Sequence, residues 1–98
     1  MRIKICGITR HEDAERALLL GADAIGCIFF RESARSVSLE QAREISRAVN
    51  GLGMLVGLFV NPTKGQVEEA LAALPIHCLQ FHGAETAEFC AQFNRPYI

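Results

Sequence analysis

The sequence lacks the features that would place it in a membrane, on nucleic acid or outside the cell. It has no tryptophan, only three prolines, and no apolar run near the ~20 residues that a membrane-spanning helix needs. Ten basic and eleven acidic side chains give a formal net charge of -1, which argues against electrostatic binding to nucleic acid or anionic lipid. The first residues contain no apolar stretch long enough for a signal peptide. We therefore expect a cytoplasmic protein with neither a membrane nor a nucleic acid among its partners.

The four cysteines are too widely spaced for a metal or redox motif. Cys6, Cys27, Cys78 and Cys90 include no C-x-x-C pair, so the sequence indicates neither a zinc knuckle nor a thioredoxin-type site. In a reducing compartment, unpaired thiols are the default. We expect free cysteines and no metal site.

What the sequence does contain is a repeat of strand and helix within 98 residues, of which 50% are hydrophobic. Short alternating or apolar segments predict strands at 2–6, 24–30, 54–60 and 77–82, and a fifth strand that begins at residue 97. Segments with helical spacing of apolar residues lie between the strands. The length allows at most one domain.

Pairs of residues three positions apart mark the predicted helix starts, because they are able to form a capping box. The pairs are Thr9 with Glu12, Ser38 with Gln41, and Thr63 with Gln66. A fourth helix is predicted over residues 84–93. Gly21 occupies a position where a helix end favours a residue with positive φ.

The alternation predicts an α/β protein with a parallel sheet and right-handed crossovers. An eight-unit barrel needs about 200–250 residues, so this chain is either half a barrel or a small open sheet. Strand parity favours the barrel, because polar side chains on one face of a buried strand suit a barrel interior. These positions are Arg2, Lys4 and Cys6 in the first strand, and Cys78, Gln80 and His82 in the fourth. We therefore expect the (β/α)8 TIM-barrel class, with about four βα units and the start of strand five.

Five short motifs follow one another along the chain: Lys4-Ile5-Cys6-Gly7-Ile8-Thr9, Gly21-Ala22-Asp23-Ala24-Ile25-Gly26, Ser33-Ala34-Arg35-Ser36-Val37-Ser38, Gly57-Leu58-Phe59-Val60-Asn61 and Leu79-Gln80-Phe81-His82-Gly83. Their order resembles that of the phosphoribosylanthranilate isomerases, single-domain (β/α)8 barrels of tryptophan and aromatic amino acid biosynthesis. The motifs span nearly the whole chain. The resemblance implies that residues 1–98 are the N-terminal half of one barrel domain.

The resemblance implies an isomerase of the aldose–ketose type, acting on a small phosphosugar. The reaction is the Amadori rearrangement of N-(5'-phosphoribosyl)anthranilate to 1-(2-carboxyphenylamino)-1-deoxyribulose 5-phosphate. A general acid protonates the furanose oxygen, the ring opens to a Schiff base, and a general base removes a proton from the neighbouring carbon. Acid–base chemistry suffices for these steps, so no cofactor is implied.

The resemblance also assigns roles to four residues. Cys6 matches the general base and Arg35 the arginine that binds the anthranilate carboxylate, while Gln80 and His82 are expected to line the substrate pocket. Cys6 ends a strand at the rim where barrel enzymes place their chemistry. A thiol has an ordinary pKa near ~8.5, so a nearby cation would help it act as a base. A guanidinium fork suits a planar carboxylate.

Each of these residues also has a purely structural interpretation. By spacing alone, Cys6 reads as a packed core cysteine and Arg35 as a solvated loop residue. His82 could equally cap the following helix or bond to backbone.

The resemblance places the general acid, an aspartate, at the end of the fifth strand, beyond Ile98. It places the phosphate site in the loops after strands seven and eight. The chain by itself is therefore expected to be inactive, and its exposed strand edges predict self-association.

Three other functions remain open from the sequence. The chain could be a non-catalytic half barrel that assembles with a partner, or a small module that binds a phosphate ligand. It could also belong to a different phosphate-binding barrel enzyme, because this fold hosts many chemistries.

Overall fold

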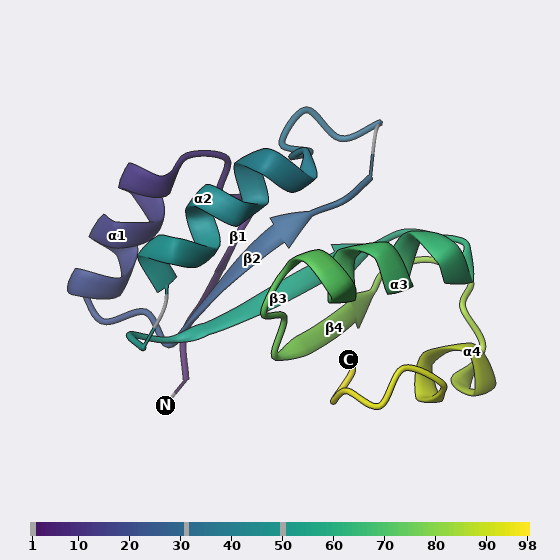
Figure 1. Ribbon diagram of the computed structural model, residues 1–98. Helices are drawn as coiled ribbons and strands as arrows, with labels where there is room; N and C mark the ends of the chain where they lie inside the picture. Colours follow the sequence, from purple (N-terminus) through teal and green to yellow (C-terminus); the bar gives the residue numbers. More distant parts are fainter. Residues whose placement is uncertain (1, 31, 50) are drawn as a thin grey trace.

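A computed structural model describes residues 2–30, 32–49 and 51–98. In these ranges strands and helices alternate along the chain (Figure 1). The elements are β1 (Lys4–Cys6), α1 (His11–Leu19), β2 (Ala24–Ile28), α2 (Leu39–Val49), β3 (Met54–Phe59), α3 (Lys64–Ala73), β4 (Cys78–Phe81) and α4 (Ala87–Ala91). The predicted alternation is confirmed, with each strand one or two residues shorter at its ends than predicted. None of the helices in these ranges is long and apolar enough to cross a membrane.

The strands form one parallel sheet in the order β1-β2-β3-β4. Each strand therefore pairs with its neighbour in sequence, as in a barrel wall, and the order never reverses as it does in a doubly wound sheet. The register places Cys6 opposite Gly26, Gly26 opposite Val56, and Val56 opposite Cys78. These four residues share one face of the sheet, which we call the inner face.

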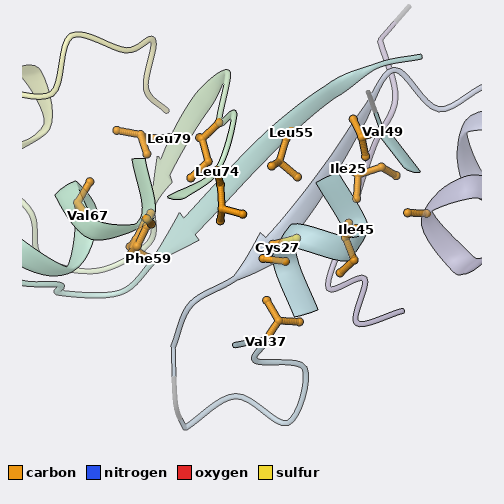
Figure 2. Packing of buried hydrophobic residues seen from close by; sticks show 14 of the residues in the cluster. Ile25, Cys27, Val37, Ile45, Val49, Leu55, Phe59, Val67, Leu74 and Leu79 are labelled. Atoms are coloured by element: carbon orange, nitrogen blue, oxygen red, sulfur yellow. The ribbon is translucent and has the colours of Figure 1, made fainter. Parts of the chain in front are cut away.

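The hydrophobic core lies on the opposite, outer face of the sheet, against the helices (Figure 2). The strand residues in this core are Ile25, Cys27, Leu55, Phe59 and Leu79, and they pack against Ala14 of α1, Ala42, Ile45 and Val49 of α2, and Val67 and Ala70 of α3. The helices α1, α2 and α3 thus cover the same face. That arrangement matches the wall of a barrel, because a doubly wound sheet carries helices on both faces.

Two of the predicted capping boxes are present. Ser38 Oγ accepts from the Gln41 backbone N–H at 3.1 Å, and Gln41 Oε1 accepts from the Ser38 N–H at 3.0 Å. Thr63 and Gln66 form the same reciprocal pair, at 3.1 and 2.8 Å. Gly21 follows α1 with φ +108°, as predicted.

The capping box predicted at the start of α1 is wrong. The helix begins at His11 with Arg10 as its N-cap, so Thr9 lies one residue too early to cap it. Glu12 instead forms an ion pair with the Arg10 guanidinium at 2.6 Å. The Glu12 carboxylate, which the predicted capping box required, is thus bound by the neighbouring Arg10.

The predicted fourth helix, 84–93, is shorter than expected. It spans Ala87–Ala91, and Thr86 Oγ1 caps it by accepting from the Phe89 N–H at 3.1 Å. The predicted start of a fifth strand is confirmed beside β4. Leu79 donates its N–H to the Pro96 carbonyl at 2.9 Å, and Ile98 donates to the Leu79 carbonyl at 2.9 Å.

The sheet is curved toward its inner face. In a flat sheet, three strand spacings would separate β1 from β4 by about 14 Å, with side chains perpendicular to the sheet. Here the Lys4 Nζ donates a hydrogen bond to Gln80 Oε1 across the inner face. The contact requires the first and fourth strands to bend toward each other. The polar inner face predicted from strand parity is therefore concave.

Cys27 gives the fold a measurable dependence on pH. Its side chain is fully buried, and burial raises the pKa of its thiol from 9.0 to about 12. Between these values the unfolded chain loses the thiol proton while the folded chain keeps it. The free energy of unfolding therefore falls as pH rises, by about 1.4 kcal/mol per pH unit from this group.

We expect Cys27→Ala to make the decline in stability above pH 9 shallower by that slope. Urea unfolding of both proteins at several pH values up to 11 measures it. The other cysteines are present in both proteins, so the difference between the two slopes reports Cys27 alone. Equal slopes would show that the Cys27 thiol does not keep its proton in the folded state.

Candidate functional site

The four residues singled out in the sequence lie at or near the carboxyl ends of the strands. Cys6 is the last residue of β1, Gln80 lies within β4, and His82 directly follows β4. Arg35 belongs to the loop between β2 and α2. Because the strands are parallel, their carboxyl ends meet at one edge of the sheet, which we call the rim.

The Cys6 thiol lies half-buried on the inner face, outside the hydrophobic core. Gly26 provides the space for it. A Cβ atom added to Gly26 would lie 2.8 Å from Cys6 Sγ and 3.3 Å from Cys6 Cα. Gly7 extends the strand pairing beyond Cys6, because its N–H donates to the Gly26 carbonyl at 3.1 Å.

The Arg35 side chain folds over the backbone that follows Cys6. A Cβ atom on Gly7 would lie 2.6 Å from Arg35 Nη1 and 2.8 Å from its Cζ. Gly7 also has φ +81°, a conformation that favours glycine. The ion pairs of the described residues do not use Arg35, so its guanidinium is available to an anion.

Gln80 and His82 share the inner face of β4 by strand alternation. Gln80 is half-buried, and its side-chain oxygen accepts from Lys4. His82 is exposed, and its N–H donates to the Phe59 carbonyl at 2.9 Å, which extends the pairing of β3 with β4 by one residue. The structure thus places one thiol, one guanidinium, one amide and one imidazole along the same rim.

A second group of rim residues was missed in the sequence. The Glu85 carboxylate accepts the N–H of Asn61, after β3, at 2.6 Å and the N–H of Gly83, after β4, at 2.8 Å. Asn61 Oδ1 in turn accepts the Ala84 N–H at 2.8 Å. Glu85 fell inside the predicted helix 84–93 and was assigned no role. Asn61, directly after a buried strand, was the available signal, because asparagine tolerates the positive φ found there.

The inner face also carries a mostly apolar pocket of about 370 Å³ toward the amino ends of the strands. Lys4, Val56 and Cys78 are among its lining residues. Burial raises the pKa of the Cys78 thiol, and the Lys4 ammonium opposes that rise. Within the described ranges, no group of three His, Cys, Asp or Glu side chains is placed to hold a metal ion. The chemistry available at the rim is proton transfer by a thiol or imidazole, together with anion binding by Arg35.

Gly26→Ala tests the space around Cys6. The added methyl would collide with the Cys6 backbone as well as its thiol, so we expect the free energy of unfolding to fall by about 1–3 kcal/mol. Gly65→Ala in α3 is the control, because its nearest neighbour is 3.9 Å away. That change should raise stability, by up to about 1 kcal/mol from helix propensity. Urea unfolding compares them, and a neutral Gly26→Ala would contradict the packing of Cys6 on Gly26.

Comparison with known proteins gives consistent matches. The sequence model of the N-(5'-phosphoribosyl)anthranilate (PRA) isomerase family matches residues 3–96. The N-(5'-phosphoribosyl)anthranilate isomerase of Pseudomonas paraeruginosa is 52% identical over 98 residues, which are 100% of this chain and 46% of that protein. The chain thus spans about half the length of the curated relatives it matches.

Solved structures agree with the sequence matches. Phosphoribosyl anthranilate isomerase from Thermus thermophilus superimposes with a TM-score of 0.88 at 37% identity, over 99% of this chain and 50% of that one. A second isomerase structure, in complex with reduced 1-(o-carboxyphenylamino)-1-deoxyribulose 5-phosphate, gives a TM-score of 0.87 at 39% identity, over 92% and 46%. The predicted fold class is confirmed, since the βα units of this chain superimpose on about half of the (β/α)8 barrel of these enzymes. The chain belongs to the N-(5'-phosphoribosyl)anthranilate isomerase family.

Proposed function

We propose that this chain is the N-terminal half of a barrel that isomerises N-(5'-phosphoribosyl)anthranilate, within a cytoplasmic enzyme of tryptophan biosynthesis. The observation that carries the proposal is the contact between the Arg35 guanidinium and Gly7. It sets a guanidinium, a group suited to binding an anion, against the residue that directly follows Cys6. A substrate whose carboxylate is bound by Arg35 would thus be anchored next to the base.

In this proposal Cys6 is the general base. A general acid protonates the ring oxygen, and the bond from this oxygen to C1 breaks as the nitrogen lone pair forms the Schiff base. The Cys6 thiolate then takes the proton from C2, and the electrons of that C–H bond form the enolamine, which tautomerises to the ketone. Arg35 binds the anthranilate carboxylate, and Gln80 and His82 line the pocket. The analogue bound by the solved relative carries both a carboxyphenyl group and a phosphate.

The remaining parts of the site belong to the second half of the barrel. The family places its acid on the fifth strand and its phosphate site after strands seven and eight. The inner face carries half-buried polar side chains, among them Lys4, Cys6 and Gln80, which a second half of the barrel would cover. The 98-residue chain alone is therefore expected to give no turnover.

A hybrid barrel tests this function. The chain would replace the matching first half of the Pseudomonas paraeruginosa relative, with which it shares 52% identity. We expect the folded hybrid to turn over N-(5'-phosphoribosyl)anthranilate and the isolated chain not to. A folded hybrid that binds the product analogue without turnover would overturn the catalytic proposal in favour of a binding module. Turnover by the isolated chain would overturn the need for a second half.

The isolated chain is also proposed to associate with itself. Ile5 of the edge strand β1 is 38% exposed, and Ile3, directly before β1, is 46% exposed. Ile98 at the chain end is 67% exposed. An open parallel edge flanked by apolar side chains is a template for further pairing. Sedimentation velocity at increasing concentration measures this, and a monomer throughout the range would contradict it.

A further inference from the structure

The loops that follow β3 and β4 are joined at the rim by a single carboxylate. Glu85 accepts the Asn61 N–H with Oε2 at 2.6 Å and the Gly83 N–H with Oε1 at 2.8 Å. The Asn61 side chain returns a third hydrogen bond by accepting the Ala84 N–H at 2.8 Å. Because both Glu85 oxygens are used, and each by a different loop, the two loops are held in one relative position.

The close approach of the two loops depends on glycine at position 83 and asparagine at position 61. A Cβ atom on Gly83 would lie 2.6 Å from Asn61 Oδ1 and 3.0 Å from the Asn61 backbone nitrogen. Only glycine leaves this approach open. Asn61 has φ +45°, which most side chains disfavour and asparagine tolerates. Two residues with special backbone or steric requirements therefore meet at Glu85.

His82 lies between the two fixed points of this arrangement. Its own N–H is held by the Phe59 carbonyl at 2.9 Å, and the N–H of the next residue, Gly83, is held by Glu85. The peptide groups on both sides of His82 are thus bonded. With the backbone fixed on both sides, strand alternation directs the imidazole to the inner face.

We propose that Glu85 and Asn61 are positioning residues that fix His82 at the rim by locking the β3 and β4 loops together. This inference rests on the proposed function, in which His82 lines the substrate pocket. Neither positioning residue takes part in proton transfer. Their effect on the reaction passes through the direction of the His82 ring.

Glu85→Gln is the sharpest variant, because an amide has one acceptor oxygen where the carboxylate has two. It must lose one of the two backbone hydrogen bonds while keeping its size. Asn61→Gly is the second variant, since it keeps the positive φ and removes only the acceptor for Ala84. Glu88→Gln is the matched control, an exposed carboxylate in α4.

The first readout is the nuclear magnetic resonance spectrum of the 98-residue chain, with His82 ring signals and amide exchange followed together. We expect Glu85→Gln and Asn61→Gly to shift the His82 ring signals and to speed exchange at the rim amides. The ring signals of His11 and His77 should stay in place, and Glu88→Gln should change nothing. Faster exchange at the rim with unmoved His82 signals would overturn the proposal, because Glu85 would then hold the two loops together without orienting His82.

The second readout is a double-mutant cycle in the hybrid barrel. Glu85→Gln is expected to lower kcat/KM by roughly tenfold, and to have little further effect when His82 is already alanine. Additive losses would mean that Glu85 acts independently of His82 and would overturn the proposal. If the hybrid has no activity at all, the proposed function fails, while the spectra of the isolated chain still decide the positioning role.

Discussion

Replacing Cys6 by alanine in the hybrid barrel is expected to lower kcat for N-(5'-phosphoribosyl)anthranilate by about 10²–10⁴-fold, the usual contribution of a general base. Alanine has no proton acceptor, and the described inner face offers no second thiol at the rim of β1. The loss should fall on kcat more than on KM, because Arg35, the proposed carboxylate ligand, is unchanged in this variant. Steady-state kinetics separates the two constants.

Cys78→Ala is the control for this experiment. Cys78 is another half-buried inner-face thiol, but it begins β4 and so lies toward the opposite end of the sheet from the rim. We expect its loss to leave kcat near that of the parent hybrid. If Cys6→Ala keeps full activity, Cys6 is not the base, and the packed-cysteine interpretation becomes the better one.

The strand–helix repeat and the polar inner face were predictable because both depend on short-range patterns. Side chains of a strand alternate between its two faces, which predicts that Lys4 and Cys6 share one face. The hydrogen bond from Lys4 to Gln80 confirms that Lys4 lies on the same face as the polar residues of β4. Two capping boxes were also predicted correctly, since all of their atoms lie within four consecutive residues. For strand parity and for these capping boxes, the residues within a few positions in sequence are sufficient to predict the structure.

The two wrong helix starts, at α1 and α4, occur where a side chain bonds to a partner outside the short sequence pattern used for the prediction. Glu12 forms an ion pair with the charged Arg10 guanidinium, and α1 begins two residues after Thr9, so the predicted pair with Thr9 does not form. The start of α4 is delayed because Glu85 bonds to Asn61, which is 24 residues away in sequence. No local periodicity carries that information.

The candidate site also combines features that nearby residues predict with contacts that depend on the folded chain. Spacing placed Cys6 and His82 at strand ends, but it could not bring Arg35 to Gly7, because that contact depends on how the loop after β2 folds over the rim. The roles of these residues came from the resemblance to the isomerases. Family membership is established by the comparisons, and the residue roles stay predictions that Cys6→Ala and its control decide.

Phe59→Ala is expected to reduce the free energy of unfolding by about 3–5 kcal/mol, the usual range for removing a buried aromatic ring. Phe59 is 2% exposed on the outer face of β3 (Figure 2). Its ring stacks on Phe29 with centroids 5.3 Å apart and lies 6.1 Å from the ring of Phe81. The ring centroids of Phe81 and Phe89, which lies in α4, are 5.8 Å apart. The loss would therefore break a row of rings that runs from Phe29, directly after β2, to α4.

Such a loss is a large share of the roughly 5–15 kcal/mol that stabilises an ordinary domain. Leu52→Ala is the control, because Leu52 is 61% exposed and its removal should change stability by no more than about 0.5 kcal/mol. Urea unfolding followed by circular dichroism compares the two. A cost below about 1 kcal/mol for Phe59→Ala would show that the surrounding rings close the cavity. Since the Phe59 carbonyl also accepts the His82 N–H, the same variant should loosen the rim, which connects the stability of the core to the geometry of the site.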